Sequence, residues 1–501
     1  MNRIKQLIGS LLIAIPVVML FTGCEKFLDR KPLTATLDDL NQGGLEGQVY
    51  GLYGAIRNGD VAGQGFGGIP WLAMHGFRAD DSEKGSSSAD GADWGVIYDE
   101  FQYVKDHWSS TTYWDQHYVL IGQANTALQL ADSLGLTDDA SRVNIAEAKF
   151  FRAFAYFDLV RAFGEVPKID FRVYNPGDAK QPKASIQEIY ALIDEDLDEA
   201  MANLPVVWQA KYKGRLTQAA ARALKAKTLL TRQNWSGAFS LAQQIILSGQ
   251  FRLLDEFSTN FKEAGENGPE SIWEIQAYIG PNGTDNYFSW YGIAQGVRGS
   301  GDWDLGWGWN TPTQSLVDAY AAGDKRKAAT IQASGEADGY GKTLPGSVFD
   351  VPSGPLPRKY WNKKVYPEPS MQSSTSNRQA GWVNQRELRY ADVLLMAAEA
   401  ANELGGTENQ LFAERYLNQV RNRAGLGNVT FVDKAQMRTA IKNERRSELA
   451  MEGERFFDLV RWGDAETVLG PAGYVPCNKY YPIPQSAIDF SGGVLVQNPC
   501  W

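Results

Sequence analysis

The 501-residue chain has little of two residue types that enzymes often use, because it contains only three cysteines and three histidines. His75, His107 and His117 do not stand in H-E-x-x-H or another spacing typical of a zinc site. No free cysteine stands beside a histidine and no G-x-S-x-G motif is present, so the common motifs of cysteine and serine nucleophiles are missing. We expect His117 to lie in a core or on a surface and not at a metal ion.

Basic charge and long apolar runs are also scarce. The formal net charge of −10 argues against nucleic acid and against anionic lipid as partners bound by charge. The one markedly apolar stretch, 7–21, follows a basic start and is too short to span a membrane, which is typical of a signal peptide. A small residue precedes Cys24 directly after it, as in a bacterial lipobox. We predict that residues 1–23 are cleaved and that Cys24 is lipidated; an ordinary signal peptide with an incidental cysteine is the alternative.

Only two cysteines follow, both near the end of the chain. Cys477 and Cys500 can pair in an exported protein. A bridge would stabilise the fold by about 3 kcal/mol on the chain-entropy model. Two buried free thiols are the alternative.

Two early loops could bind a ligand on sequence grounds. Residues 63–68 match G-x-G-x-x-G, but no strand precedes them and Pro70 follows, so we expect a flexible loop without a helix N-terminus for a phosphate. A Ser- and Gly-rich loop after it contains Asp80, Asp81, Glu83, Asp90 and Asp93. Its oxygens could hold calcium, although the EF-hand order is absent; a solvated acidic loop without a cofactor is the preferred interpretation.

Helical periodicity dominates the rest of the chain. Amphipathic or alanine-rich helices are predicted from Trp114 onward and over 143–163, 185–203, 219–230, about 235–248, from Leu388, and over 408–424. Small residues between neighbouring helices and short breaks predict tetratricopeptide-like helix hairpins. Residues 255–385 differ, being rich in Gly, Pro and aromatics, with one strand predicted over 270–275. We expect helical regions 24–254 and 386–501 to form one scaffold, with 255–385 as an irregular ligand-binding insertion.

The segment 444–463 concentrates glutamate and arginine residues. On a helix, Glu444 and Glu448 lie one turn apart, and Arg445 neighbours Glu448. This pattern would suit the carboxylate pair of a glycosidase or a buried ion-pair network. Arginine neighbours lower the pKa of a carboxylate, which is wrong for a general acid at neutral pH, so we favour the network.

Aromatic residues gather in two places. Between residues 287 and 309 stand Tyr287, Phe288, Trp290, Tyr291, Trp303, Trp307 and Trp309. A second group follows the acidic loop: Trp94, Tyr98, Phe101, Tyr103 and Trp108. A glycine-rich backbone is not expected to bury so many rings, and exposed rings can stack on the apolar faces of sugars. The candidate ligand-binding residues are Trp94, Tyr98, Tyr287, Trp290, Asp302, Trp303, Asp304, Trp307, Trp309 and Asn310. The alternative is that these rings pack the loops onto the scaffold.

Motifs along the whole chain resemble the SusD/RagB family of outer-membrane lipoproteins. In order they are Phe27-Leu28-Asp29, Trp114 to Asn125, Glu147 to Pro167, Leu388 to Ala400, Asn418 to Gly425, 444–463, and Tyr481 to Pro484. The resemblance implies a mostly α fold, a right-handed superhelix of tetratricopeptide-like pairs with a loop-rich insertion carrying a few short strands. Ligand residues vary within the family, so the resemblance transfers none of them.

The resemblance also implies a function and a location. It implies a non-catalytic protein, anchored through Cys24 to the outer membrane and facing outward, that binds glycan. Its implied partner is a TonB-dependent β-barrel transporter of the SusC type. A lid for peptides or other nutrients, a protein-interaction scaffold and a surface glycosidase are the alternatives.

Overall fold

The computed structural model describes residues 43–59, 64–87, 89–281, 287–344 and 360–501. The predicted signal peptide, Cys24 and the first glycine of the 63–68 motif lie outside these residues. The chain divides into two compact units, residues 1–48 and 49–501.

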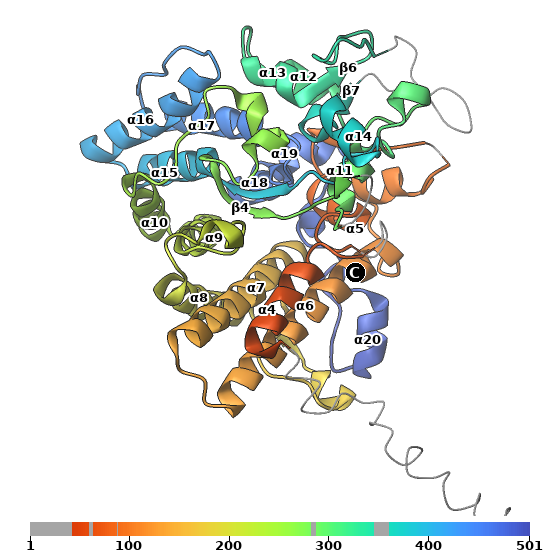
Figure 1. Ribbon diagram of the computed structural model, residues 1–501, viewed down its shortest axis with the longest axis vertical. Helices are drawn as coiled ribbons and strands as arrows, with labels where there is room; N and C mark the ends of the chain where they lie inside the picture. The colour runs from red at the N-terminus through yellow and green to blue at the C-terminus, as the bar shows by residue number, and fades with distance from the viewer. Residues whose placement is uncertain (1–42, 60–63, 88, 282–286, 345–359) are drawn as a thin grey trace, which may run out of the picture. The chain divides into compact units, whose positions relative to one another are not determined.

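Helices form the scaffold, and the longest of them pack against the next along the chain (Figure 1). They are α4 (Gly44–Ala55), α5 (Ile69–His75), α6 (Trp108–Ser133), α7 (Asp139–Phe163), α8 (Ile186–Asn203), α9 (Gln218–Thr231) and α10 (Trp235–Leu247). After the insertion come α15 (Tyr390–Leu404), α16 (Thr407–Arg423), α17 (Lys434–Leu449), α18 (Arg455–Trp462), α19 (Ala465–Leu469) and α20 (Gln485–Ser491). Helix α15 packs directly on α10, so the scaffold continues across the insertion.

Local signals explain where the helices begin and end. The Asp138 carboxylate accepts a hydrogen bond from the backbone of Ser141 and caps α7, which ends at Gly164 with φ of +77°. At α8, Ser185 and Glu188 form a capping box. The sequence-predicted helices over 143–163, 185–203, 219–230, 235–248 and 408–424 are thus confirmed, with shifts at their ends.

Two details of the sequence prediction are wrong. Leu388 does not begin α15, because it lies in strand β8 (Gln385–Arg389) opposite Trp273 of β4 (Ser271–Ile275). A helix does follow the glycine-rich loop, since α5 tolerates Pro70 in its first turn. The start of α5 is buried, so it offers no open anion site.

The insertion contains short helices and two-stranded antiparallel sheets. Its helices are α11 (Trp290–Gln295), α12 (Gln314–Ala319), α13 (Lys325–Thr330) and α14 (Pro369–Thr375). The remaining strands are β1 (Ser82–Gly85), β2 (Val166–Pro167), β3 (Lys183–Ala184), β5 (Trp309–Pro312), β6 (Ile331–Ala333) and β7 (Tyr360–Asn362). Strand pairs β1–β5 and β4–β8 connect the insertion to earlier and later parts of the chain, and the pairs β2–β3 and β6–β7 complete the set. The strand predicted over 270–275 is confirmed as β4.

The tail of the chain is fastened covalently. Cys477 and Cys500 form a disulfide, which confirms their predicted pairing. Within the described ranges, no helix combines the length and apolarity needed to cross a bilayer.

Candidate functional site

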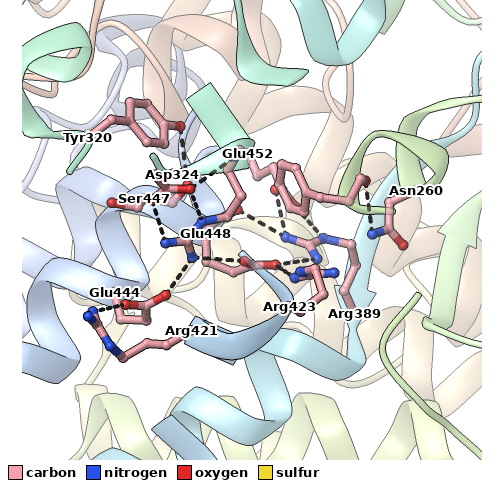
Figure 2. A network of polar contacts seen from close by, with 12 residues as sticks. Asn260, Tyr320, Asp324, Arg389, Arg421, Arg423, Glu444, Ser447, Glu448 and Glu452 are labelled. Atoms are coloured by element: carbon pink, nitrogen blue, oxygen red, sulfur yellow. Dashed lines mark hydrogen bonds and ion pairs between the residues drawn. The ribbon is translucent and has the colours of Figure 1, made fainter. Parts of the chain in front are cut away.

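Glu448 occupies the centre of a buried ion-pair network (Figure 2). Its Oε1 accepts hydrogen bonds from Arg423 at 2.5 Å and from Arg389 at 3.1 Å. Its Oε2 accepts from Arg326 of α13 at 3.1 Å. Burial raises the pKa of Glu448, but the three guanidinium groups outweigh it and hold the pKa below its ordinary value. Glu448 therefore stays ionised at neutral pH and cannot serve as a general acid.

The surrounding residues extend this network from helix to helix. Arg445 pairs with Asp392 of α15 at 2.7 Å and with Asp458 of α18 at 3.0 Å. Glu444 behaves differently from the expectation for a carboxylate beside arginines. Although Arg326 pairs with it at 2.6 Å, burial dominates and the net pKa of Glu444 is raised. The interpretation of 444–463 as an ion-pair network agrees with this geometry.

Asp80 and Asp81 form ion pairs with arginines of the 444–463 segment, which corrects the prediction of a solvated acidic loop for these two residues. Arg455 donates to Asp80 at 2.7 Å, and Arg446 donates to Asp81 at 2.7 Å. Across the part of the chain that the structure describes, no three histidine, cysteine or acidic side chains gather as metal ligands would. The calcium alternative thus has no ligand set among these residues.

Glu387 is a second buried carboxylate with an unusual pKa. Burial raises the pKa of Glu387 to about 8, with the charge of Asp158 adding to the effect. The carboxylate accepts a hydrogen bond from the Gln385 side chain at 2.5 Å and lines a cavity of about 20 Å³. That volume holds about one water molecule and no sugar ring, so the raised pKa does not mark a glycosidase acid.

Five of the candidate ligand residues are buried, which corrects the prediction that they contact a ligand. They are Trp94, Tyr98, Trp303, Trp309 and Asn310. The ring of Trp94 packs on Trp309 at 5.2 Å between centroids, and the Tyr98 hydroxyl is 3.0 Å from Nδ1 of His107. The Asn310 amide donates to Gln295 at 2.8 Å.

Glycine permits this burial instead of preventing it. Gly308 has φ of +71°, and a Cβ there would come within 2.8 Å of the Trp361 ring. Trp303 packs in the same cluster as Trp361, and only 7% of it is exposed. The premise that a glycine-rich backbone cannot bury many rings was therefore wrong, because glycines let loops approach bulky rings closely.

Other rings of the insertion remain accessible. We define the aromatic surface as Tyr278, Tyr287, Phe288, Trp290 and Trp307. Tyr287 is 54% exposed and Trp307 is 36% exposed, while Trp290 is half-buried. Rings of this kind offer apolar faces for the C–H groups of a sugar, and their polar edges can form hydrogen bonds.

Specific contacts hold the aromatic surface together. The backbones of Tyr278 and Tyr287 exchange two hydrogen bonds, of 2.9 and 2.8 Å. The indole of Trp290 packs edge-on against Trp307 at 5.5 Å between centroids and donates to the Gly59 carbonyl at 3.1 Å. The Arg57 guanidinium lies 5.1 Å from the centre of the Tyr287 ring. These rings are thus held in place before a ligand arrives.

Among the candidate ligand-binding residues, Tyr287, Trp290 and Trp307 come together on the aromatic surface. Asp302 is exposed, and its carboxylate pairs with Lys342 at 3.0 Å and Arg378 at 3.1 Å. Hydrogen bonds from these two cations lower the pKa of Asp302. Asp304 is exposed as well.

Sequence reasoning missed Tyr278 and Arg57, and it placed Phe288 in the 287–309 aromatic group without choosing it as a candidate ligand residue. A Pro-Asn-Gly turn signal between Tyr278 and Tyr287 could have predicted that these two residues pair across a hairpin. Arg57 lies more than two hundred residues away along the chain and carries no comparable signal.

Comparisons with known proteins agree with this architecture. A family model described as SusD family matches residues 339–478, and one described as starch-binding associating with outer membrane matches residues 72–230. The chain is 29% identical to SusD-like protein P2 of Formosa agariphila, covering 85% of this chain and 87% of that relative. It is 30% identical to SusD-like protein P38 of the same organism, covering 72% and 75%. A solved structure described as a laminarin binding SusD-like protein matches with a TM-score of 0.74 at 26% identity, over 91% of this chain and 99% of that one. The chain belongs to the SusD/RagB family.

Proposed function

We propose that this protein captures an oligosaccharide or polysaccharide at the cell surface and releases it uncleaved. The observation that carries the proposal is the aromatic surface, where Tyr287 and Trp307 stay exposed although most rings of the insertion are buried. Stacking on these rings supplies affinity, and neighbouring polar groups supply hydrogen bonds to sugar hydroxyls. The laminarin-binding description of one structural relative and the starch-binding description of one family model support a glycan as the ligand.

The proposal includes a route for the bound glycan. Lipidation of Cys24 would tether the protein to the outer membrane, and a TonB-dependent transporter of the SusC type would receive the glycan. The sequence position of Cys24 and the family membership support this part. Direct contact with such a transporter can be tested by co-purification of the two full-length proteins from membranes.

The absence of bond cleavage is part of the same proposal. A retaining or inverting glycosidase requires two carboxylates that face the sugar, one of them with a raised pKa. Glu448 is engaged by arginines, and Glu387 lines a space for one water molecule. Neither carboxylate is arranged to act on a glycan.

Calorimetry against a panel of glycans, with chromatography of the same mixtures, tests the proposal. The glycans include laminarihexaose and maltoheptaose, and a mixed peptide pool is measured beside them. We expect one or more glycans to bind and to be recovered at full length. Shortened products would establish a glycosidase, and binding of peptides alone would establish a peptide-binding lid; either result would overturn the proposal.

A further inference from the structure

A separate pocket lies in the insertion, between the short 3-10 helices η4 (Phe257–Phe261) and η8 (Lys363–Val365) and helix α13. Its volume is about 300 Å³, at the lower end of the size range for small-ligand sites. We call it the lysine pocket, because its lining includes Lys262, Lys325 and Lys363. The aromatic lining residues are Phe261, Tyr340 and Tyr366, and none of these six belongs to the aromatic surface.

The three lysines have no counter-charge at bonding distance. No described carboxylate pairs with the ammonium group of Lys262, Lys325 or Lys363. Lys363 is half-buried, and burial lowers its pKa; the charges of Asp338 and Glu336 oppose this shift, and the charge of Lys262 adds to it. Lys262 lies 5.5 Å from the centre of the Tyr340 ring. The charges of Lys262 and Lys363 repel each other at this pocket, so an anion entering it would relieve the repulsion.

The cations next to Lys363 and Lys325 in the sequence differ from these lysines, because they are buried in ion pairs. Lys364, next to Lys363, is buried and pairs with Glu452 at 2.5 Å. Arg326, next to Lys325, is buried and pairs with Glu448 at 3.1 Å. These buried cations thus join the ion-pair network. The scaffold does not use the outward-facing lysines.

The acidic residues of the lining form no direct ion pair with the lysines, although the charge of Asp338 acts to raise the pKa of Lys363. Asp338 is buried, and its carboxylate accepts hydrogen bonds from the Tyr366 hydroxyl and the Tyr340 backbone, both at 2.7 Å. These bonds position two tyrosine rings that stack with a 6° angle between planes. Tyr340 is 39% exposed, so part of it is accessible at the pocket. Glu256 is exposed at the edge.

We propose that the lysine pocket binds an anionic sugar residue, a saccharide ring that carries a carboxylate or a sulfate. The anion lies among Lys262, Lys325 and Lys363, and the apolar face of the ring lies against Tyr340. The inference rests on the proposed glycan capture and narrows the substrate class to acidic polysaccharides. Charge recognition by lysine requires no particular bond geometry, and it therefore accepts either kind of anion.

Calorimetry with three saccharide probes tests the inference on the mature protein. The probes are a galacturonate hexasaccharide, a sulfated galactan hexasaccharide and neutral laminarihexaose. The test variant is Lys262→Gln with Lys363→Gln, and the matched control is Lys211→Gln. Lys211 is also exposed and lies 4.5 Å from a tyrosine ring, that of Tyr212, but it stands outside the pocket.

We expect at least one anionic probe to bind, with an affinity that falls at least tenfold in the double variant and stays unchanged in Lys211→Gln. The affinity of the anionic probe should also fall as salt is raised. The two anionic probes distinguish carboxylate from sulfate. Lys325→Gln provides a second variant with an expected loss of about threefold, and an unchanged melting temperature shows that each variant is folded.

Two results would overturn the inference. One is binding of laminarihexaose while neither anionic probe binds, which would leave the proposed glycan capture intact. The other is anionic binding that survives in the double variant. If none of the glycan panel binds, the proposed function itself fails, and this outcome is recognised by the loss of neutral and anionic binding together.

Discussion

The segment 444–463 and the aromatic surface both concentrate residues associated with binding and catalysis, but the fold uses them in opposite ways. Around Glu448, every charge is turned inward and paired, and the carboxylate is fully buried. Tyr287 and Trp307 remain partly exposed, although Arg57 lies over the Tyr287 ring and Trp290 packs against Trp307. Density of functional groups along the sequence therefore does not identify a site. A binding site is distinguished by side chains that stay exposed and are able to contact a ligand in the folded protein.

The largest expected effect is on stability, when the buried carboxylate of Glu448 is removed. Glu448→Gln leaves three buried arginines short of a counter-charge, so we expect the free energy of unfolding to fall by about 3–5 kcal/mol. Denaturant titration measures the change, and Glu466→Gln on exposed α19 is the matched control. Glycan affinity of the folded fraction should be unaffected. If Glu448→Gln is as stable as the wild type but no longer binds glycan, Glu448 has a direct role in function.

Trp303 and Trp307 of the insertion provide a paired comparison. Trp303→Ala should lower the free energy of unfolding by about 3 kcal/mol, because it leaves a cavity in the Trp361 cluster. Trp307→Ala should change stability by less than about 1 kcal/mol, since its ring is partly exposed. Thermal and denaturant unfolding of both variants measures the contrast. Equal destabilisation would show that Trp307 is a core residue and would weaken its assignment to the aromatic surface.

A smaller effect concerns the dependence of stability on pH. In the folded state the pKa of Glu387 is raised to about 8, above that of an unfolded glutamate. The stability that the protonated Glu387 side chain contributes is therefore complete at low pH and is lost as the pH rises toward 8. Glu387→Gln should remove this loss and stabilise the protein at pH 8 relative to wild type by at least about 1.4 kcal/mol, equivalent to one pKa unit. Unfolding titrations at pH 5 and pH 8 check the prediction, with Glu336→Gln as an exposed control. The prediction is wrong if the difference in unfolding free energy between pH 5 and pH 8 is the same in Glu387→Gln as in the wild type.

The helical scaffold could be predicted from sequence because its signals are local. The apolar period over 143–163, the cap at Asp138 and the stop at Gly164 all act within a few residues of α7. The strand at β4 was predictable from alternation. Leu388 was misplaced because its partner Trp273 lies more than a hundred residues away.

The candidate site was predicted less well, because exposure depends on long-range packing. Trp303 and Trp307 stand four residues apart in similar glycine-rich surroundings, yet one is buried in a cluster and the other is exposed. The ion pair between Asp81 and Arg446 spans 365 residues. No local pattern could have shown that the acidic loop would be paired with the 444–463 segment.

The most direct test of the central claim is glycan binding by the double variant Tyr287→Ala with Trp307→Ala. The ligand is the glycan that binds most tightly in the calorimetric panel, and Tyr174→Ala, an exposed ring elsewhere on the scaffold, is the control. The account predicts a loss of affinity of at least tenfold, about 1.4 kcal/mol, with unchanged unfolding and full-length glycan recovered. Unchanged affinity in the double variant would contradict the claim that the aromatic surface is the capture site.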